Sequence, residues 1–247
     1  MTLRAFDEGR LFGRVHGSLP ARVLALHGWG RSGADFDAIL AGLDAVALDL
    51  PGFGASPEPA AAWSSDDYAA AVERALPEIG SRPVVVGHSF GGRVAVRLAA
   101  RRPDAVAGLV LTGVPLYRRS NAARGASPIY RLYRVLHRLG LVGDARMERL
   151  RRRYGSADYR AASPTMRGVL VQAVNEEYDD ALAQVRCPVR LVWGADDEAA
   201  PADVARRAAE RLGERAELTV LEGHGHFVTR SAPAELRRAI EELLAGG

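Results

Sequence analysis

The sequence predicts an α/β protein with a mostly parallel, twisted sheet and helices on both of its faces. Short apolar runs, each bounded by turn residues, alternate along the chain with stretches of helical spacing. Most of these runs are continuously apolar, which is typical of strands that are covered on both faces. The chain has 247 residues, 48% of them apolar. This length is enough for one large domain with a buried core.

The expected strands begin near the N-terminus. Residues Arg4–His16 are expected to form an antiparallel hairpin at one edge of the sheet. The parallel strands are expected at six apolar runs: Val23–His27, Ala45–Leu50, Pro83–Gly87, Gly108–Thr112, Val189–Gly194 and Ala216–Leu221.

The expected helices lie between these strands. The first has serines followed by two aspartates at its start, a pattern typical of a capped helix. The second stops before a proline, and the third opens with a proline and closes at a glycine. The fourth has apolar residues at helical spacing. These helices are expected at Ser65–Ile79, Val94–Arg101, Pro201–Leu212 and Pro233–Leu244.

Residues 116–182 break the alternation of strand and helix. Prolines and glycines divide this stretch into three or four short pieces of helical character, without an obvious strand. We therefore expect a core made of residues 1–115 and 183–247. Residues 116–182 are expected to form a helical insertion over one end of the sheet.

Composition excludes several classes of protein. The single cysteine excludes an intramolecular disulfide, and no apolar run reaches the roughly 18 residues of a membrane span. The first 17 residues lack the apolar segment of a signal peptide, so a cytoplasmic location is expected. No zinc-ligand spacing, phosphate-binding glycine loop or nucleic-acid recognition motif is present, so no metal, cofactor or nucleic acid is expected.

The strongest chemical signal is the sequence Gly87-His-Ser89-Phe-Gly91, which follows an apolar strand and precedes a helix. In that context a G-x-S-x-G motif predicts a nucleophile elbow, a sharp turn that exposes the serine hydroxyl above the sheet. The new helix also directs its free N–H groups at the reacting centre.

A serine nucleophile needs a base, and the base needs an orienting carboxylate. Either His224 or His226, after the last strand, can supply the base. The acid is expected within Asp196–Glu198, because no acidic residue follows the run at 108–112. The backbone N–H groups of Trp29 and Phe90 are candidates for an oxyanion hole.

Together these motifs resemble the α/β-hydrolase superfamily, and the resemblance covers the whole chain except the insertion. Carried over residue by residue, it implies Ser89 as nucleophile, Asp197 as acid and His226 as base. It also implies Trp29 and Phe90 as oxyanion donors and identifies the insertion as a helical cap. The matching segments, in family order, are His27-Gly-Trp-Gly, Asp49-Leu-Pro-Gly-Phe-Gly-Ala-Ser56, Gly87-His-Ser-Phe-Gly-Gly92, Trp193-Gly-Ala-Asp-Asp197 and Gly225-His-Phe227.

The resemblance implies a serine hydrolase that cleaves a carboxylic ester, thioester or lactone through an acyl-enzyme. Two alternatives stay open. The same triad serves carbon–carbon (meta-cleavage product) hydrolases and acyltransferases, and a hydrolase-like receptor can bind a ligand without turnover.

The charge distribution adds a hypothesis about the substrate. Residues 116–170 hold 13 arginines against three acidic residues, a local balance of +10, whereas the rest of the chain carries −7. A small ester that is anionic or linked to an acidic carrier protein would be attracted to this segment. Alternatively, these arginines are solvated helix faces. The oligomeric state is not indicated. The candidate binding residues are Arg118, Arg119, Arg131 and Arg134.

Overall fold

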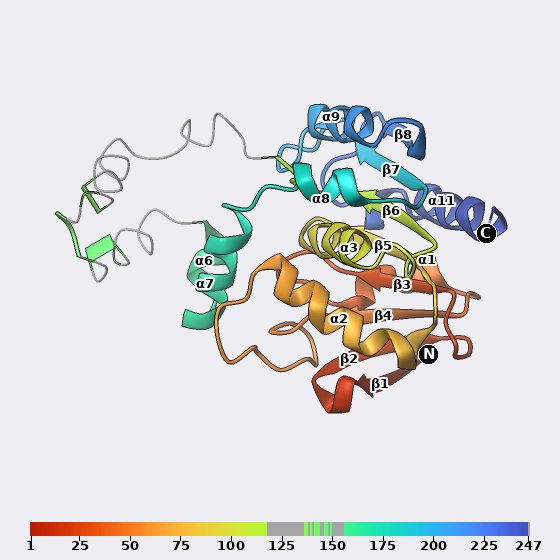
Figure 1. The fold of residues 1–247 in the computed structure, drawn as a ribbon, viewed down its shortest axis with the longest axis horizontal. Coiled ribbons are helices and arrows are strands. Elements are labelled where there is room, and N and C mark those ends of the chain that lie inside the picture. The colour runs from red at the N-terminus through yellow and green to blue at the C-terminus, as the bar shows by residue number, and fades with distance from the viewer. Residues whose placement is uncertain are drawn as a thin grey trace.

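The structure, a computed structural model, describes residues 1–117, 136–137, 139, 141–143, 146–147, 149 and 156–246. Within these residues the predicted α/β architecture is confirmed as an eight-stranded sheet of order β1-β2-β4-β3-β5-β6-β7-β8 (Figure 1). The strands are β1 (Thr2–Phe6), β2 (Leu11–His16), β3 (Val23–Leu26), β4 (Ala45–Asp49), β5 (Val84–His88), β6 (Gly108–Thr112), β7 (Val189–Gly194) and β8 (Ala216–Leu221).

Strands β3 to β8 run parallel, and the hairpin expected within residues 4–16 is confirmed as the antiparallel pair β1 and β2. Strand β5 lies between β3 and β6 in the middle of the sheet, with Val85 opposite Leu24 and Leu109. All five of its residues are buried. The motif that follows β5 is therefore held at the centre of the carboxyl edge of the sheet.

Helices cover both faces of the sheet (Figure 1). One apolar core lies between the sheet and α2, α3, α8 and α9, and the other between the sheet and α1, α10 and α11. The helices are α1 (Asp37–Leu40), α2 (Ser65–Ile79), α3 (Phe90–Arg101), α6 (Ala157–Ala161), α7 (Pro164–Ala173), α8 (Asp179–Gln184), α9 (Ala202–Leu212), α10 (Val228–Ser231) and α11 (Pro233–Ala245).

Helix α3 differs from its predicted range because it begins at Phe90 rather than at Val94. Two consecutive glycines weaken the local preference for helix over this first turn. The packing overrides that preference. A side chain at Gly91 would place its Cβ 2.1 Å from the carbonyl oxygen of Leu26 on β3. Glycine thus lets the helix start directly after Ser89 and against the neighbouring strand.

Three described helices lie in the stretch expected to form a helical insertion. Helix α7 packs at the carboxyl edge of the sheet, where Met166 contacts the backbone of Gly52 in the loop after β4. Helix α8 joins the core beside α3, with Leu182 buried. The boundary at residues 116 and 182 stays a prediction. Among the described helices, none is long and apolar enough to cross a membrane.

The four candidate binding arginines lie outside the described residues. They are Arg118, Arg119, Arg131 and Arg134.

Candidate active site

Ser89 occupies the sharp turn between β5 and α3. Its backbone has φ +50° and ψ −111°, a conformation that side-chain-bearing residues rarely adopt. The turn is held by the Ser89 N–H group, which donates to the carbonyl of Thr112 at 3.0 Å. Glycine is required at position 87, since a Cβ there would lie 2.5 Å from the Cα of Gly92. The motif therefore folds as the elbow that the sequence predicts.

His226 links Ser89 to Asp197. Its Nε2 lies 3.1 Å from the Ser89 hydroxyl oxygen, and its Nδ1 lies 2.8 Å from Asp197 Oδ2. A carboxylate can only accept hydrogen bonds, so Nδ1 carries the proton and Nε2 accepts from the serine hydroxyl. The structure thus brings together the three residues to which the resemblance assigns the triad, from loops after three different strands.

The Asp197 side chain is only 1% exposed and is fixed by its own loop. Its Oδ1 accepts the N–H groups of Ala199 and Ala200, both at 2.8 Å. The loop is held in turn by the buried Trp193, whose indole N–H donates to the carbonyl of Ala200 at 2.6 Å. These contacts leave Oδ2 directed at His226.

The loops that carry the acid and the base are hydrogen-bonded to each other. The N–H group of Asp196 donates to the carbonyl of His224 at 2.9 Å, while the imidazole of His224 contacts the Ser231 hydroxyl at 2.8 Å. Asp196 itself is exposed. Of the alternatives that the sequence left open, the geometry brings Asp197 and His226 to Ser89, whereas Asp196 and His224 shape the surrounding loops.

Sequence reasoning missed Gly113, which follows β6 between the strands of the nucleophile and the acid. Its φ is +59°, and a Cβ there would lie 3.0 Å from His226 Nδ1 and 3.2 Å from Asp197 Oδ2. The position must be free of a side chain for the imidazole and the carboxylate to meet. A glycine after a strand gave no signal of this in a chain with 26 glycines.

His88 packs beneath the base. Its Nε2–H donates to the backbone carbonyl of His226 at 3.0 Å, and the two rings lie 4.9 Å apart. Its Nδ1 is buried and has no hydrogen-bond partner among the described residues. Burial, with a smaller effect from the charge of His226, lowers the pKa of His88 to about 4. The ring therefore stays neutral while it holds the carbonyl of His226.

The loop after β3 brings Trp29 beside the nucleophile. A Cβ at Gly28 would lie 3.4 Å from the Cβ of Ser89, so this loop runs directly past the serine. The buried His27 fixes the loop, because its Nδ1–H donates to the carbonyl of Gly28 at 2.7 Å and its Nε2 accepts the N–H of Leu50 at 2.9 Å. Burial also lowers the pKa of His27.

Phe90 is the first residue of α3, where helical N–H groups have no acceptor within the helix. Its ring contacts those of Trp29 and Tyr68, with centroid separations of 5.4 and 5.0 Å. The Tyr68 hydroxyl lies 3.9 Å from the sulfur of Met166 on α7. An apolar wall thus extends from the oxyanion candidates to α7. No group of three metal-ligating side chains occurs within the described part of the chain.

Comparison with known proteins agrees with this geometry. A model described as "Alpha/beta hydrolase family" matches residues 23–239. The chain belongs to this family. One relative of this family member is lipase LipV of Mycobacterium tuberculosis, 48% identical over 96 residues. That match spans 37% of this chain and only 36% of the lipase, so it compares about a third of each protein.

Two further relatives match over nearly the whole hydrolase-family chain. The pimeloyl-[acyl-carrier protein] methyl ester esterase of Aromatoleum aromaticum is 31% identical, covering 91% of this chain and 98% of the esterase. The 2-hydroxy-6-oxononadienedioate/2-hydroxy-6-oxononatrienedioate hydrolase of Burkholderia vietnamiensis is 26% identical, covering 93% and 85%. Among solved structures, E-2-(acetamidomethylene)succinate hydrolase has a TM-score of 0.75 at 23% identity, covering 99% of both chains. This last likeness shows the fold alone.

Proposed function

We propose that the chain is a serine hydrolase that cleaves a carboxylic ester, thioester or lactone. The observation that carries this proposal is the pair of contacts made by His226, 3.1 Å to Ser89 and 2.8 Å to Asp197. Neutral imidazole with its proton on Nδ1 is the state required of a general base.

In the proposed reaction, the Ser89 oxygen attacks the carbonyl carbon while its proton passes to His226 Nε2. The alcohol leaves with that proton, and the acyl group stays on Ser89. Water then loses a proton to the same nitrogen, attacks the acyl-enzyme and releases the acid. Asp197 stabilises the imidazolium in both steps, because its carboxylate is buried and its second oxygen is already satisfied by backbone N–H groups.

The developing oxyanion requires donors that are in place before the reaction. We assign this role to the backbone N–H groups of Trp29 and Phe90, since one lies in the loop past Ser89 and the other starts α3. Loss of one such donor lowers turnover by roughly 10²–10³-fold.

For the substrate, we propose a small-molecule ester whose acyl group is anionic or carrier-linked. Two facts support this class: the +10 balance of residues 116–170, and the name of the esterase that matches 91% of this chain. The assignment of individual arginines remains a prediction, because the four candidates lie outside the described residues.

The test is hydrolysis of p-nitrophenyl esters from acetate to decanoate by the wild type and by Ser89→Ala. We expect turnover in the wild type and its loss in the variant, with circular dichroism as the control for folding. An alcohol that outcompetes water would identify an acyltransferase instead.

A carbon–carbon hydrolase is the second candidate, because a relative named for hydrolysis of a dienedioate covers most of this chain. Folded wild type that cleaves a meta-cleavage product but no ester would establish it. Folded wild type that cleaves neither compound, and binds a ligand without turnover, would favour the receptor.

A further inference from the structure

The arginine in the first turn of α3 contacts both ends of the segment predicted to form the cap. Arg93 lies four residues after Ser89 and is only 9% exposed. Its Nε and Nη2 donate to the carbonyl of Pro115 at 3.1 and 2.9 Å, and its Nη1 donates to the carbonyl of Ala173. Pro115 follows β6, where the chain leaves the core, and Ala173 ends α7, where it returns.

A buried guanidinium is unfavourable unless its N–H groups find acceptors. Here the printed hydrogen-bond acceptors of Arg93 are backbone carbonyls, and its charge also faces the ring of Tyr178 at 5.6 Å. Burial lowers the pKa of Arg93, yet a guanidinium stays protonated in proteins. Truncating it would leave the carbonyls of Pro115 and Ala173 without these donors.

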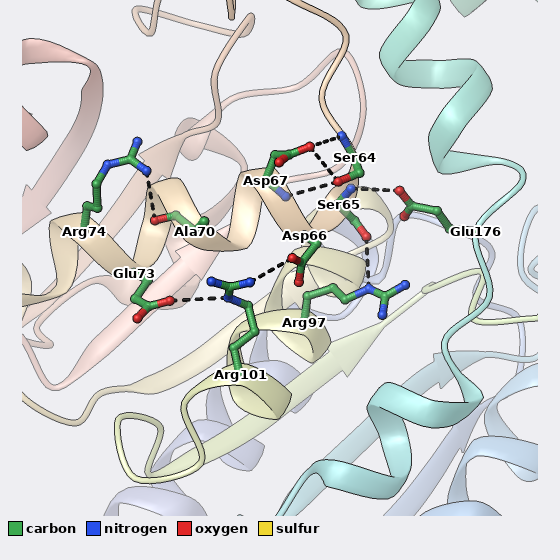
Figure 2. Close-up of polar contacts among 10 residues, drawn as sticks. All are labelled: Ser64, Ser65, Asp66, Asp67, Ala70, Glu73, Arg74, Arg97, Arg101 and Glu176. Atoms are coloured by element: carbon green, nitrogen blue, oxygen red, sulfur yellow. Dashed lines mark hydrogen bonds and ion pairs between the residues drawn. The ribbon is translucent and has the colours of Figure 1, made fainter.

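The returning chain has a second attachment, which does not involve Arg93. Figure 2 shows that Glu176 accepts the N–H group of Ser65 at the start of α2, at 2.9 Å. Arg97 contacts the Ser65 hydroxyl at 3.4 Å and donates to the carbonyl of Glu177 at 3.1 Å. Residues 176 and 177 therefore remain attached to α2 and α3 when Arg93 is changed, and only Pro115 and Ala173 are released.

The end that Arg93 holds is the end of a helix that reaches the active site. Met166 on α7 lies against Gly52 and near the Tyr68 hydroxyl. The Tyr68 ring in turn packs on Phe90, next to Ser89. A shift of α7 would therefore alter the apolar wall beside the nucleophile.

We propose that Arg93 is a positioning residue that ties both ends of the predicted cap to the helix following Ser89 and so holds α7 against the active site. Its effect on the ordering of α7 stands on these contacts alone, whereas its effect on substrate binding rests on the proposed esterase function.

The first test is hydrogen–deuterium exchange on the full chain. In Arg93→Met we expect amide exchange in α7 to accelerate at least tenfold, since hydrogen bonds to a buried charged group are lost. Exchange in β5 and α2 should not change. The matched control is Arg101→Met on the same helix, because Arg101 pairs with Asp66 at 2.8 Å and Glu73 at 3.3 Å (Figure 2). It should leave α7 unchanged.

Unchanged exchange in α7 of folded Arg93→Met, or a uniform increase throughout the core, would overturn the proposal. Arg93→Lys keeps the charge but has a single ammonium group that cannot reproduce the guanidinium fork. It should give intermediate exchange in α7, and it supplies the test if Arg93→Met does not fold.

The second test separates binding from chemistry. In Arg93→Met we expect KM for p-nitrophenyl decanoate to rise at least fivefold, while kcat for p-nitrophenyl acetate stays within twofold of the wild type. Arg93→Lys should restore part of the KM, and Arg101→Met should leave it unchanged. Faster exchange in α7 with an unchanged KM would overturn the positioning role. Wild type inactive on every ester would refute the proposed function, while exchange would still decide whether Arg93 orders α7.

Discussion

Replacing Asp197 by asparagine should abolish the base function of His226 without removing any heavy atom from the site. Oδ1 accepts two backbone N–H groups, from Ala199 and Ala200, so the amide oxygen of the variant must keep that position. The amide NH₂ then faces His226 Nδ1, which has to accept. The imidazole proton moves to Nε2, where it faces Ser89 and prevents the nitrogen from taking the serine proton.

The expected magnitude follows from this forced tautomer. Comparable substitutions in serine hydrolases lower kcat by about 10⁴-fold, which corresponds to roughly 5 kcal/mol of transition-state stabilisation. KM should change little, because the carboxylate is buried behind the imidazole and lies away from the substrate. The assay is steady-state hydrolysis of the best p-nitrophenyl ester at pH 7, with thermal unfolding as the measure of folding.

The matched control is Asp196→Asn, the neighbouring and exposed aspartate. Its contact to the base loop is made by its backbone N–H group, which the substitution retains. We expect its kcat to equal that of the wild type. A folded Asp197→Asn variant with kcat within tenfold of the wild type would refute the tautomer argument, and a large loss in Asp196→Asn would reassign the acid.

Three further predictions concern other parts of the molecule. Gly113→Ala should lower kcat by about 10–100-fold, because its Cβ would displace His226 or Asp197 by a few tenths of an ångström. Gly42→Ala, with a similar φ of +77° and open space around it, should lower only the melting temperature. Because the pKa of His88 falls from 6.5 to about 4 on folding, the unfolded chain binds the proton more readily. The resulting stabilisation is full above pH 6.5 and lost as pH falls towards 4. Urea unfolding at pH 7 and 5 should therefore show a loss of about 2 kcal/mol that His88→Asn removes. Finally, hydrolysis of an anionic ester should slow as salt rises, whereas hydrolysis of a neutral ester should not; equal salt responses would exclude steering by the arginine-rich segment.

The sequence was sufficient to predict the sheet because its buried strands are short apolar runs between turn residues. The elbow was predictable for a similar reason. Glycines around Ser89 are a local pattern, and each is required by backbone contacts, as with Gly87 against Gly92. The start of α3 was not predictable, since the contact of Gly91 with Leu26 belongs to the packed sheet and not to the local sequence.

The roles of Gly113 and Arg93 are also not readable from the sequence. Gly113 matters because of side chains that lie far along the chain, at positions 197 and 226. The acceptors of Arg93 are backbone carbonyls 22 and 80 residues away, and carbonyls occur at every residue. A pattern of residue types therefore carries no information about this arginine, which looks like any other charged helix residue.

The backbone of Ser89 implies that the active chain is not the most stable version of its own fold. A φ of +50° at a residue with a side chain costs of order 1–3 kcal/mol, and glycine adopts it without that penalty. Ser89→Gly should therefore melt at a higher temperature than the wild type while losing its nucleophile. Selection for heat resistance alone would favour exactly the substitution that ends activity, so thermal stability and turnover are opposed at this one position.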